Sequence, residues 1–504
     1  MMTIQQLQNG SDIRGIAITT EEWQANLTQI EANRIAQGVF AWFKTKGLAH
    51  NDTVKIAIGH DSRLSATELK TGIIEGFLNE KVEIVDVQLA TTPAMFMATQ
   101  FEEIGADIGI MITASHLPFY YNGIKLFTKN GGAEHDDIEE ILTIAATKEV
   151  SVGTEGSVEK QDLIPLYAAD LVAKIQAKTE EEKPLTGFHL IVDAGNGAGG
   201  FFATQVLETL GADTTGSQFL DPDGSFPNHM PNPDNKEAME SIQAAVLKEQ
   251  ADMGIIFDTD VDRAAVVDAT GQVINRNNLI AVLATMVLEE NPGSTIVTNS
   301  PTSSHLKDFI ELLGGRQVRY LCGYRNVINK AIDLNKENVE TPLAIETSGH
   351  AAFKENYFLD DGAYVIAKIL MLLPKLRSQG QTIGDLIGQL KQPVEAQEVR
   401  FRILADDDRA EGQRVIDALS EFVKMTPGMT EDPETDEGIR VNVHDEFGSG
   451  WFLLRLSLHE PLLVLQVEND EAVKNHQVFS ALEKFFIEQK ELNADKLTAV
   501  IQAK

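Results

Sequence analysis

A buried strand that opens onto a short polar loop occurs three times in this chain. The strands are expected at residues 108–112, 251–257 and 342–346, where short apolar runs end abruptly in polar or turn-forming residues. The loops that follow read Thr-Ala-Ser-His, Asp-Thr-Asp-Val-Asp-Arg and Glu-Thr-Ser-Gly-His. Strands that alternate with helices favour an α/β sheet, and such sheets bind ligands beyond the carboxyl ends of their strands. We therefore expect three repeats of one α/β unit, each ending in a functional loop.

The sequence between these strands supports the repeat, and its character changes near residue 394. Before that point the hydrophobic pattern predicts helices at 21–43, 65–79, 202–210 and 304–313. The second of these helices is expected to begin with a capping box formed by Ser65 and Glu68. After residue 394, strand-like alternation recurs, followed by an amphipathic helix; the strands are expected at 398–403, 438–443 and 451–467, and the helix at 470–489.

The length of the chain, 504 residues, is too great for a single hydrophobic core. The predicted fold class is α/β, with three related mixed α/β domains followed by a smaller α+β C-terminal domain. The expected domain boundaries are 1–152, 153–268, 269–392 and 393–504.

The composition limits the partners and the location that we expect. A formal net charge of −34 opposes polyanions, so we expect no nucleic acid and no membrane partner. A phosphate enzyme with this charge must gather its cations locally. The first residues lack the basic and apolar regions of a signal peptide, which favours a cytoplasmic protein. The single cysteine, Cys322, excludes a disulfide framework and is expected to fill core space.

Three carboxylates alternate along the loop after the second strand, at Asp258, Asp260 and Asp262. In an extended loop these side chains can converge on one hard cation such as Mg²⁺, and without a counter-ion they would repel one another. A calcium EF-hand does not fit, because its sixth position would be Arg263 instead of glycine and its twelfth Ala269 instead of glutamate. The pattern predicts a divalent metal site, with a solvated acidic turn as the alternative.

A glycine-rich segment offers a competing function. Residues 195–200 fit the spacing G-x-G-x-x-G after a strand, which is typical of dinucleotide binding in oxidoreductases. The acid that should contact the ribose is out of place, because Asp213 precedes the next expected strand and Asp221 lies in a turn. Close packing of strand and helix is therefore the favoured interpretation of these glycines, and nucleotide binding is the alternative.

Three further groups are candidates for chemistry, each with a structural alternative. Ser115 lies on the loop after the first strand and is either a reactive hydroxyl or a helix cap. The third loop combines groups suited to recognising hydroxyls, or forms a helix N-terminus capped by its serine; its members are Glu346, Ser348 and His350. Alternating residues in the C-terminal part form an anion clamp or a solvated face; they are Arg455, Ser457 and His459.

These motifs together resemble the α-D-phosphohexomutase family. Thr113-Ala-Ser-His with Asn122-Gly-Ile-Lys125 is similar to the active-serine motif, and residues 258–263 are similar to the metal loop. Residues 346–350 resemble the sugar loop, and Arg455-Leu-Ser-Leu-His-Glu-Pro461 resembles the phosphate-binding loop of the fourth domain. Pro222-Asp-Gly-Ser-Phe-Pro-Asn-His229 and Gly323-Tyr-Arg325 also match family patterns. The order and spacing of four motifs make the resemblance specific.

The resemblance implies an isomerase of carbohydrate metabolism that interconverts hexose 6-phosphate and hexose 1-phosphate. Ser115 would be carried as phosphoserine, and its phosphate would share Mg²⁺ with Asp258, Asp260 and Asp262. A hexose 1,6-bisphosphate would be the intermediate and activator. Charge neutralisation would come from Arg14, Arg263 and Lys125. Lys125 or His116 would handle the hydroxyl proton, and His350 would do so in the second orientation of the sugar.

The same resemblance assigns the contacts to the sugar phosphate. The hydroxyls would be read by the third loop, and the non-reacting phosphate would be held by Arg325, Arg455, Ser457 and His459. The chain also departs from the family pattern, with Leu117 beside the serine, Thr259 and Val261 in the metal loop, Leu458 and His459 in the phosphate loop, and His60 and Arg325 at two basic positions. These departures leave glucose, mannose and glucosamine phosphates open as substrates.

The predicted function is therefore that of a phosphomannomutase/phosphoglucomutase-like enzyme acting on a small sugar phosphate. A phosphoglucosamine mutase is the alternative within the family. Two alternatives from other classes are a dinucleotide-dependent oxidoreductase and a non-catalytic sugar-phosphate binding protein.

Overall fold

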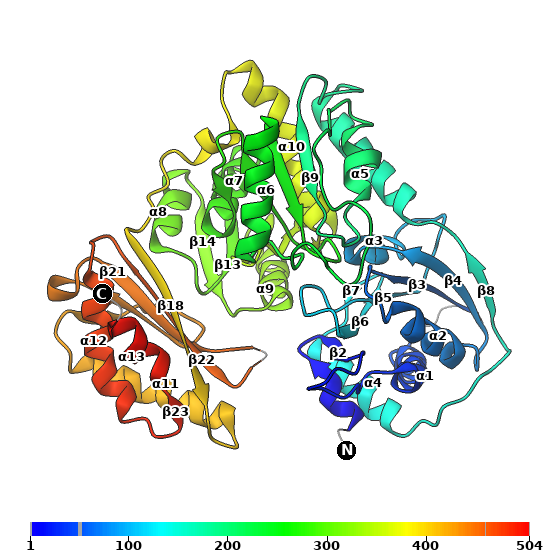
Figure 1. Ribbon diagram of the computed structural model, residues 1–504, viewed down its shortest axis with the longest axis horizontal. Coiled ribbons are helices and arrows are strands. Elements are labelled where there is room, and N and C mark those ends of the chain that lie inside the picture. The colour runs from blue at the N-terminus through cyan, green and yellow to red at the C-terminus, as the bar shows by residue number, and fades with distance from the viewer. Residues whose placement is uncertain (1–2, 49–52, 459, 503–504) are drawn as a thin grey trace. The chain divides into compact units, whose positions relative to one another are not determined.

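The computed structural model describes residues 3–48, 53–458 and 460–502 (Figure 1). The chain forms two compact units. The first consists of Met1–Leu279 with Ser348–Leu386, and the second of Ile280–Thr347 with Ile387–Lys504. No helix among the described residues has the length and apolar character needed to cross a membrane.

The first unit begins with a mixed sheet in the strand order β1-β2-β6-β5-β3-β4-β8, with β7 paired to β6. Its strands are β1 (Gln8–Asn9), β2 (Asp12–Ile16), β3 (Val54–His60), β4 (Val82–Leu89), β5 (Ile108–Ile112), β6 (Tyr121–Thr128), β7 (Gly131–Gly132) and β8 (Ser157–Lys160). The helical elements are η1 (Ile4–Leu7), α1 (Gln29–Thr45), α2 (Ala66–Phe77), α3 (Thr92–Met97) and α4 (His135–Ala146). A buried apolar cluster that includes Phe43, Ile56 and Ile110 joins α1 to the sheet.

Two expectations for this region are wrong in detail. The helix expected at 21–43 begins only at Gln29, because Thr28 and Glu31 form a capping box that fixes the start of α1. The capping box expected at Ser65 is absent from α2. The Ser65 hydroxyl instead accepts a hydrogen bond from Asn122 Nδ2 at 2.9 Å, which ties the start of α2 to β6.

The first unit continues with a second sheet in the order β12-β11-β10-β9. Its strands are β9 (Leu190–Asp193), β10 (Met253–Phe257), β11 (Ala264–Asp268) and β12 (Val273–Ile274), and its helices include α5 (Ile164–Thr179), α6 (Lys236–Glu249) and α10 (Gly362–Ser378). Strands β9 and β10 are parallel, whereas β10 and β11 form an antiparallel hairpin around the expected metal loop. The helix expected at 202–210 is a short π-helix, Phe202–Leu207.

The remaining elements of the two units complete three α/β regions and a C-terminal α+β region. In the second unit β13 (Thr295–Asn299) pairs in parallel with β14 (Arg316–Tyr320) and β15 (Leu343–Ile345). The nearby helices are α7 (Arg276–Glu290), α8 (Ser304–Leu312) and α9 (Tyr324–Lys336). In the first unit β16 (Ala351–Phe353) and β17 (Leu359–Asp360) form a hairpin, and η3 (Lys354–Asn356) is a short 3-10 turn between them. Two further 3-10 turns are η4 (Ile383–Ile387), where the chain passes from the first unit to the second, and η5 (Asp445–Phe447) in the second unit.

The C-terminal sheet has the order β19-β20-β21-β22-β18-β23. Its strands are β18 (Glu395–Ile403), β19 (Met429–Glu431), β20 (Ile439–Val443), β21 (Gly450–Leu456), β22 (Leu462–Asn469) and β23 (Leu492–Asn493). One apolar cluster joins this sheet to α11 (Asp408–Lys424), α12 (Lys474–Ile487) and α13 (Asp495–Gln502), whose colours run from gold to red in Figure 1. The expected α+β arrangement is therefore confirmed.

The domain boundaries expected from the sequence stay a prediction. Strand β8, at Ser157–Lys160, lies beyond the expected boundary at residue 152 but pairs in parallel with β4. The first sheet thus uses a segment that the sequence pattern assigns to the second domain.

Candidate active site

Ser115 lies on the loop that joins β5 to the antiparallel strand β6. The residue is 2 % exposed and has a φ of +49°, in the left-handed region that non-glycine residues rarely adopt. Its backbone N–H donates to Thr113 Oγ1 at 2.9 Å. The apolar run that predicts β5 therefore ends as expected, and the chain then turns sharply to present the serine.

The three aspartates lie on the connection between β10 and β11, and Asp258, Asp260 and Asp262 are fully buried. One carboxylate oxygen from each lies within 4.8 Å of the others. The Oδ1 atoms of Asp260 and Asp262 accept no hydrogen bond from any described residue. Buried carboxylate oxygens without donors are costly unless a cation binds them, so the donor set fits a hard divalent ion such as Mg²⁺.

The serine hydroxyl faces this carboxylate cluster. Ser115 Oγ donates to Asp258 Oδ2 at 2.8 Å, and Arg263 Nη2 donates to Ser115 Oγ at 3.2 Å. His116 Nδ1 lies 3.3 Å from the same oxygen. The first unit thus brings a carboxylate of the candidate metal cluster, a cation and an imidazole to the oxygen of the expected nucleophile.

Cationic side chains surround the cluster, as a phosphate site in an acidic protein requires. Lys125 on β6 is buried and forms ion pairs with Asp262 and with Asp260, the latter at 3.5 Å. Arg263 contacts Asp258 at 3.1 Å. Arg14 lies on β2, which pairs with β6, and contacts Asp12 at 2.9 Å. Three cationic side chains are therefore concentrated at this site.

Burial and neighbouring charges shift the pKa values of these groups in different directions. Burial and the neighbouring Asp262 raise the pKa of Asp258 well above its usual value. Burial would also raise the pKa of Asp262, but the charges of Lys125, His350 and Arg263 outweigh it and lower that pKa. The charge of Arg263, with burial, lowers the pKa of His116 well below its usual value. This lowering favours the neutral form of the His116 imidazole.

His350 belongs to the same site, because its Nδ1 lies 2.6 Å from Asp360 Oδ2 and 4.0 Å from Asp262 Oδ1. Burial alone would lower the pKa of His350, but the two carboxylates raise it to about 9. Ser348, on the same loop, has a buried hydroxyl with no partner among the described residues. Two of the three residues expected to recognise hydroxyls therefore lie in the first unit.

The other expected substrate contacts lie in the second unit. Glu346 Oε1 accepts a hydrogen bond from the backbone N–H of Gly323 at 2.7 Å, just before α9. Arg325 is in the first turn of α9, and its Nη2 donates to Asn329 Oδ1 at 3.3 Å. Burial would lower the pKa of Arg455 on β21, but the neighbouring groups Cys322, Glu437, Glu398 and, least of them, Glu346 outweigh it and raise that pKa.

The phosphate loop after β21 is only partly described. Arg409 of α11 donates to the backbone oxygens of Ser457 and Leu458 at 2.8 and 2.7 Å. His459 lies outside the described residues. Cys322 is buried as expected, and burial raises the pKa of its thiol.

Three contributors to the site had no role in the sequence interpretation. Asp61 and Arg63 follow β3, the strand beside β5, and both contact the serine loop. Thr92 donates its hydroxyl to Asp260, and its N–H donates to the Asp260 backbone oxygen at 2.8 Å. The signal that points to Asp61 and Arg63 is their position at the carboxyl end of a strand in the same sheet.

The glycine-rich segment supports the metal loop by close packing. A Cβ atom on Gly197 would lie 2.7 Å from the backbone oxygen of Thr259, and one on Gly200 would lie 2.1 Å from that of Leu220. The N–H of Ala198 donates to the Thr259 oxygen at 2.8 Å. Protein backbone therefore fills the approach that a dinucleotide would need, in agreement with the packing interpretation.

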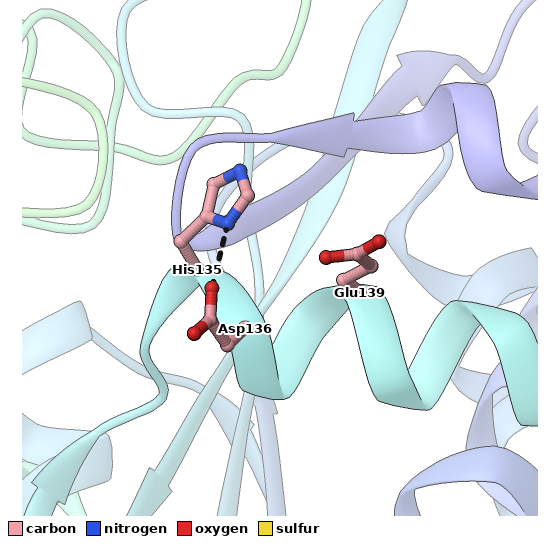
Figure 2. Close-up of side chains that lie close together, drawn as sticks. All are labelled: His135, Asp136 and Glu139. Carbon is pink, nitrogen blue, oxygen red and sulfur yellow. Dashed lines mark hydrogen bonds and ion pairs between the residues drawn. The ribbon is translucent and has the colours of Figure 1, made fainter.

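A further group with metal-ligand side chains lies on α4, where Figure 2 shows His135, Asp136 and Glu139. All three are exposed, and His135 Nδ1 lies 3.2 Å from Asp136 Oδ1. Exposed carboxylates keep their hydration, so we assign no function to this group.

Comparison with known proteins identifies the family. Models for phosphoglucomutase/phosphomannomutase alpha/beta/alpha domains I, II and III match residues 5–151, 165–271 and 275–393. The chain is 32% identical over 461 residues to a phosphoglucomutase of Neisseria gonorrhoeae, covering 91% of this chain and 92% of that protein. It is 31% identical over 418 residues to a phosphomannomutase/phosphoglucomutase of Pseudomonas putida, covering 82% and 84%.

A solved structure agrees with these relatives. A phosphoglucomutase/phosphomannomutase family protein of Burkholderia thailandensis superposes with a TM-score of 0.79 at 27% identity, covering 97% of this chain and 98% of that one. The resemblance drawn from the four motifs is thus confirmed. The chain belongs to the phosphoglucomutase/phosphomannomutase branch of the α-D-phosphohexomutase family of isomerases.

Proposed function

We propose that this protein moves a phosphoryl group between the 6- and 1-positions of a hexose phosphate, with Ser115 as the phosphoryl carrier. The observation that carries the proposal is the contact of Ser115 Oγ with both Asp258, at 2.8 Å, and Arg263, at 3.2 Å. A buried serine beside a carboxylate cluster and a guanidinium suits a hydroxyl that carries a phosphoryl group, because the cation can stabilise the charge on that group.

We assign the metal to a set of four side chains: Ser115, Asp258, Asp260 and Asp262. When bound there, Mg²⁺ would neutralise negative charge that develops on the phosphoryl oxygens. Arg14, Arg263 and Lys125 would add fixed positive charge around the same group. In the cycle that we propose, Ser115 gives its phosphoryl group to a hexose monophosphate and takes back the other phosphoryl group of the hexose 1,6-bisphosphate.

Proton transfer requires a group at the hexose hydroxyl that accepts the phosphoryl group. We assign this role to His116 or Lys125 in one orientation of the sugar and to His350 in the other. The position of His116 supports the first assignment, because its Nδ1 lies 3.3 Å from Ser115 Oγ. The contact between His350 and Asp360 supports the second, since a carboxylate partner fixes the imidazole orientation.

Substrate recognition is assigned to the third loop and to four further side chains. Hydroxyl recognition falls to Glu346, Ser348 and His350, and the non-reacting phosphate to Arg325, Arg455, Ser457 and His459. The names of the relatives favour glucose or mannose phosphate over glucosamine phosphate.

The test is the variant Ser115→Ala, assayed on glucose, mannose and glucosamine phosphates with Mg²⁺ and hexose 1,6-bisphosphate. Removal of the nucleophile should lower kcat by more than about 1,000-fold. The control variant is Ser378→Ala, which changes an exposed serine at the end of α10. Wild-type turnover by Ser115→Ala would refute the phosphoserine mechanism. Binding of the sugar phosphates by the wild-type protein without any turnover would favour the non-catalytic alternative.

A further inference from the structure

The fully buried side chain of Arg63 is hydrogen-bonded to the backbone of the serine loop. The side chain of Arg63 has no exposed surface. Its Nη1 donates to the backbone oxygens of Pro118 and Tyr121 at 2.8 and 2.9 Å, and its Nη2 donates to those of Ser115 and Leu117, both at 2.5 Å. The planar guanidinium presents its donors in a fixed fork, so a single side chain binds three carbonyl groups of the loop and one at the start of β6.

A second chain of hydrogen bonds reaches the serine from Asp61. Asp61 Oδ1 accepts from the backbone N–H of Arg63 at 2.9 Å, and Asp61 Oδ2 accepts from the Thr113 hydroxyl at 2.7 Å. The Thr113 hydroxyl in turn accepts from the backbone N–H of Ser115 at 2.9 Å. Because its proton is given to Asp61, the Thr113 oxygen is left oriented to receive the Ser115 amide.

These contacts meet at a strained residue. Ser115 has a φ of +49°, and a non-glycine residue in this region costs about 1 kcal/mol or more. Such a conformation persists only where the surrounding structure determines it. Arg63 holds the carbonyl group of Ser115, and Thr113 holds its amide group. Both sides of the strained residue are therefore fixed.

The segment 222–229 packs against this arrangement. A Cβ atom on Gly224 would lie 2.3 Å from the backbone oxygen of Ser62, so this glycine allows the segment to pack directly on the loop after β3. The ring of Phe226 lies 5.4 Å from Arg63 Cζ, in cation–π range. The Pro-Asp-Gly-Ser-Phe-Pro motif thus packs next to the guanidinium of Arg63.

We propose that Asp61, Arg63 and Thr113 are positioning residues that hold Ser115 in the conformation in which its hydroxyl faces Asp258 and Arg263. This inference rests on the proposed role of Ser115 as phosphoryl carrier. It also accounts for the departure at Leu117, since Arg63 binds the backbone oxygen of that residue and not its side chain. Leucine at this position therefore leaves the support of the loop intact.

The test compares Thr113→Val with Thr113→Ser. Valine keeps the shape of threonine but removes the hydroxyl, so the Ser115 amide loses its acceptor and Asp61 Oδ2 loses its donor. Displacement of the nucleophile should lower kcat by up to about 100-fold and leave KM for the hexose phosphate nearly unchanged. Serine restores the hydroxyl and should restore kcat. A single-turnover measurement of Ser115 phosphorylation by hexose bisphosphate should show the same pattern.

Two further variants keep the proposal falsifiable if Thr113→Val does not fold. Asp61→Asn retains the shape of the side chain but not its charge, and Arg63→Lys retains the charge but not the fork; both should lower kcat more than they change KM. Wild-type kcat in the folded variants, or a loss confined to KM, would overturn the proposal. If Ser115→Ala is inactive while these variants are normal, only the positioning role fails. If Ser115→Ala is active, the proposed phosphoserine function itself fails.

Discussion

The buried imidazole of His229, at the end of segment 222–229, is hydrogen-bonded to Asp193. That residue ends β9, the strand that precedes the glycine-rich loop. The Nε2 atom of His229 lies 3.0 and 3.1 Å from the two carboxylate oxygens of Asp193, and its Nδ1 lies 3.1 Å from the Met230 backbone oxygen. Burial alone would lower the pKa of His229, but the hydrogen bond and charge of Asp193 outweigh it and raise the pKa. Both ring nitrogens lie next to acceptors, so both N–H groups of the protonated ring can donate a hydrogen bond.

This residue predicts a pH-dependent stability. Because the pKa of His229 is raised in the folded state, its contribution should be complete below the unfolded value of about 6.5 and should be lost as pH rises through the folded value. His229→Gln should lower the free energy of unfolding by about 1–2 kcal/mol at pH 6 and by less at pH 9. Denaturant unfolding of both proteins at the two pH values measures this, and an equal difference at both values would contradict it.

At the residue scale, the sequence predicts the groups that lie directly after a buried strand. Ser115, Asp258, Asp260 and Asp262 are found together because each follows an apolar run that ends at a polar loop. The sequence interpretation does not connect Arg63 to Ser115, because the partners of its guanidinium are backbone oxygens more than fifty positions away. Contacts of side chains with distant backbone leave no spacing pattern that sequence reasoning can use.

At the element scale, the metal loop depends on the glycine-rich loop beside it. Gly197 brings its backbone against Thr259, which lies between two of the expected metal ligands. The strands before the three loops were predictable from their apolar runs, whereas the run expected at 451–467 is divided into β21 and β22. The ends of helices were also less predictable. Helix α1 begins eight residues after the expected position, since its capping box and not its hydrophobic pattern decides where it starts. The π-helix at Phe202–Leu207 is likewise not encoded in a 3.6-residue period.

The variant Gly197→Ala tests this dependence. Its Cβ would lie 2.7 Å from the Thr259 oxygen, so the metal loop must shift, and the variant should lose about 1–3 kcal/mol of stability and bind Mg²⁺ more weakly. Gly132→Ala is the matched control, because its Cβ would find its nearest atom at 3.6 Å. Calorimetric titration with Mg²⁺ measures the affinity. Equal affinities in the wild type and Gly197→Ala would contradict the account, as would tight nicotinamide binding that Gly197→Ala weakens.

At the scale of the whole molecule, the chain passes between its two compact units within the third functional loop. Glu346 and Thr347 belong to the second unit, whereas Ser348 and His350 belong to the first. The serine, the carboxylate cluster and its cations are all contained in the first unit. The sequence pattern predicts the three α/β regions and the C-terminal α+β region. It does not predict this division, because contacts between distant segments determine it.

The central claim is that Ser115 carries the phosphoryl group, and mapping of the phosphate during turnover tests it most directly. The wild-type protein is mixed with hexose 1,6-bisphosphate and Mg²⁺, quenched in acid and analysed by peptide mass spectrometry, before and after a chase with hexose monophosphate. The account predicts one phosphate on Ser115 that the chase removes. Turnover with the phosphate on another residue, or a phosphate on Ser115 that hexose monophosphate never removes, would contradict it.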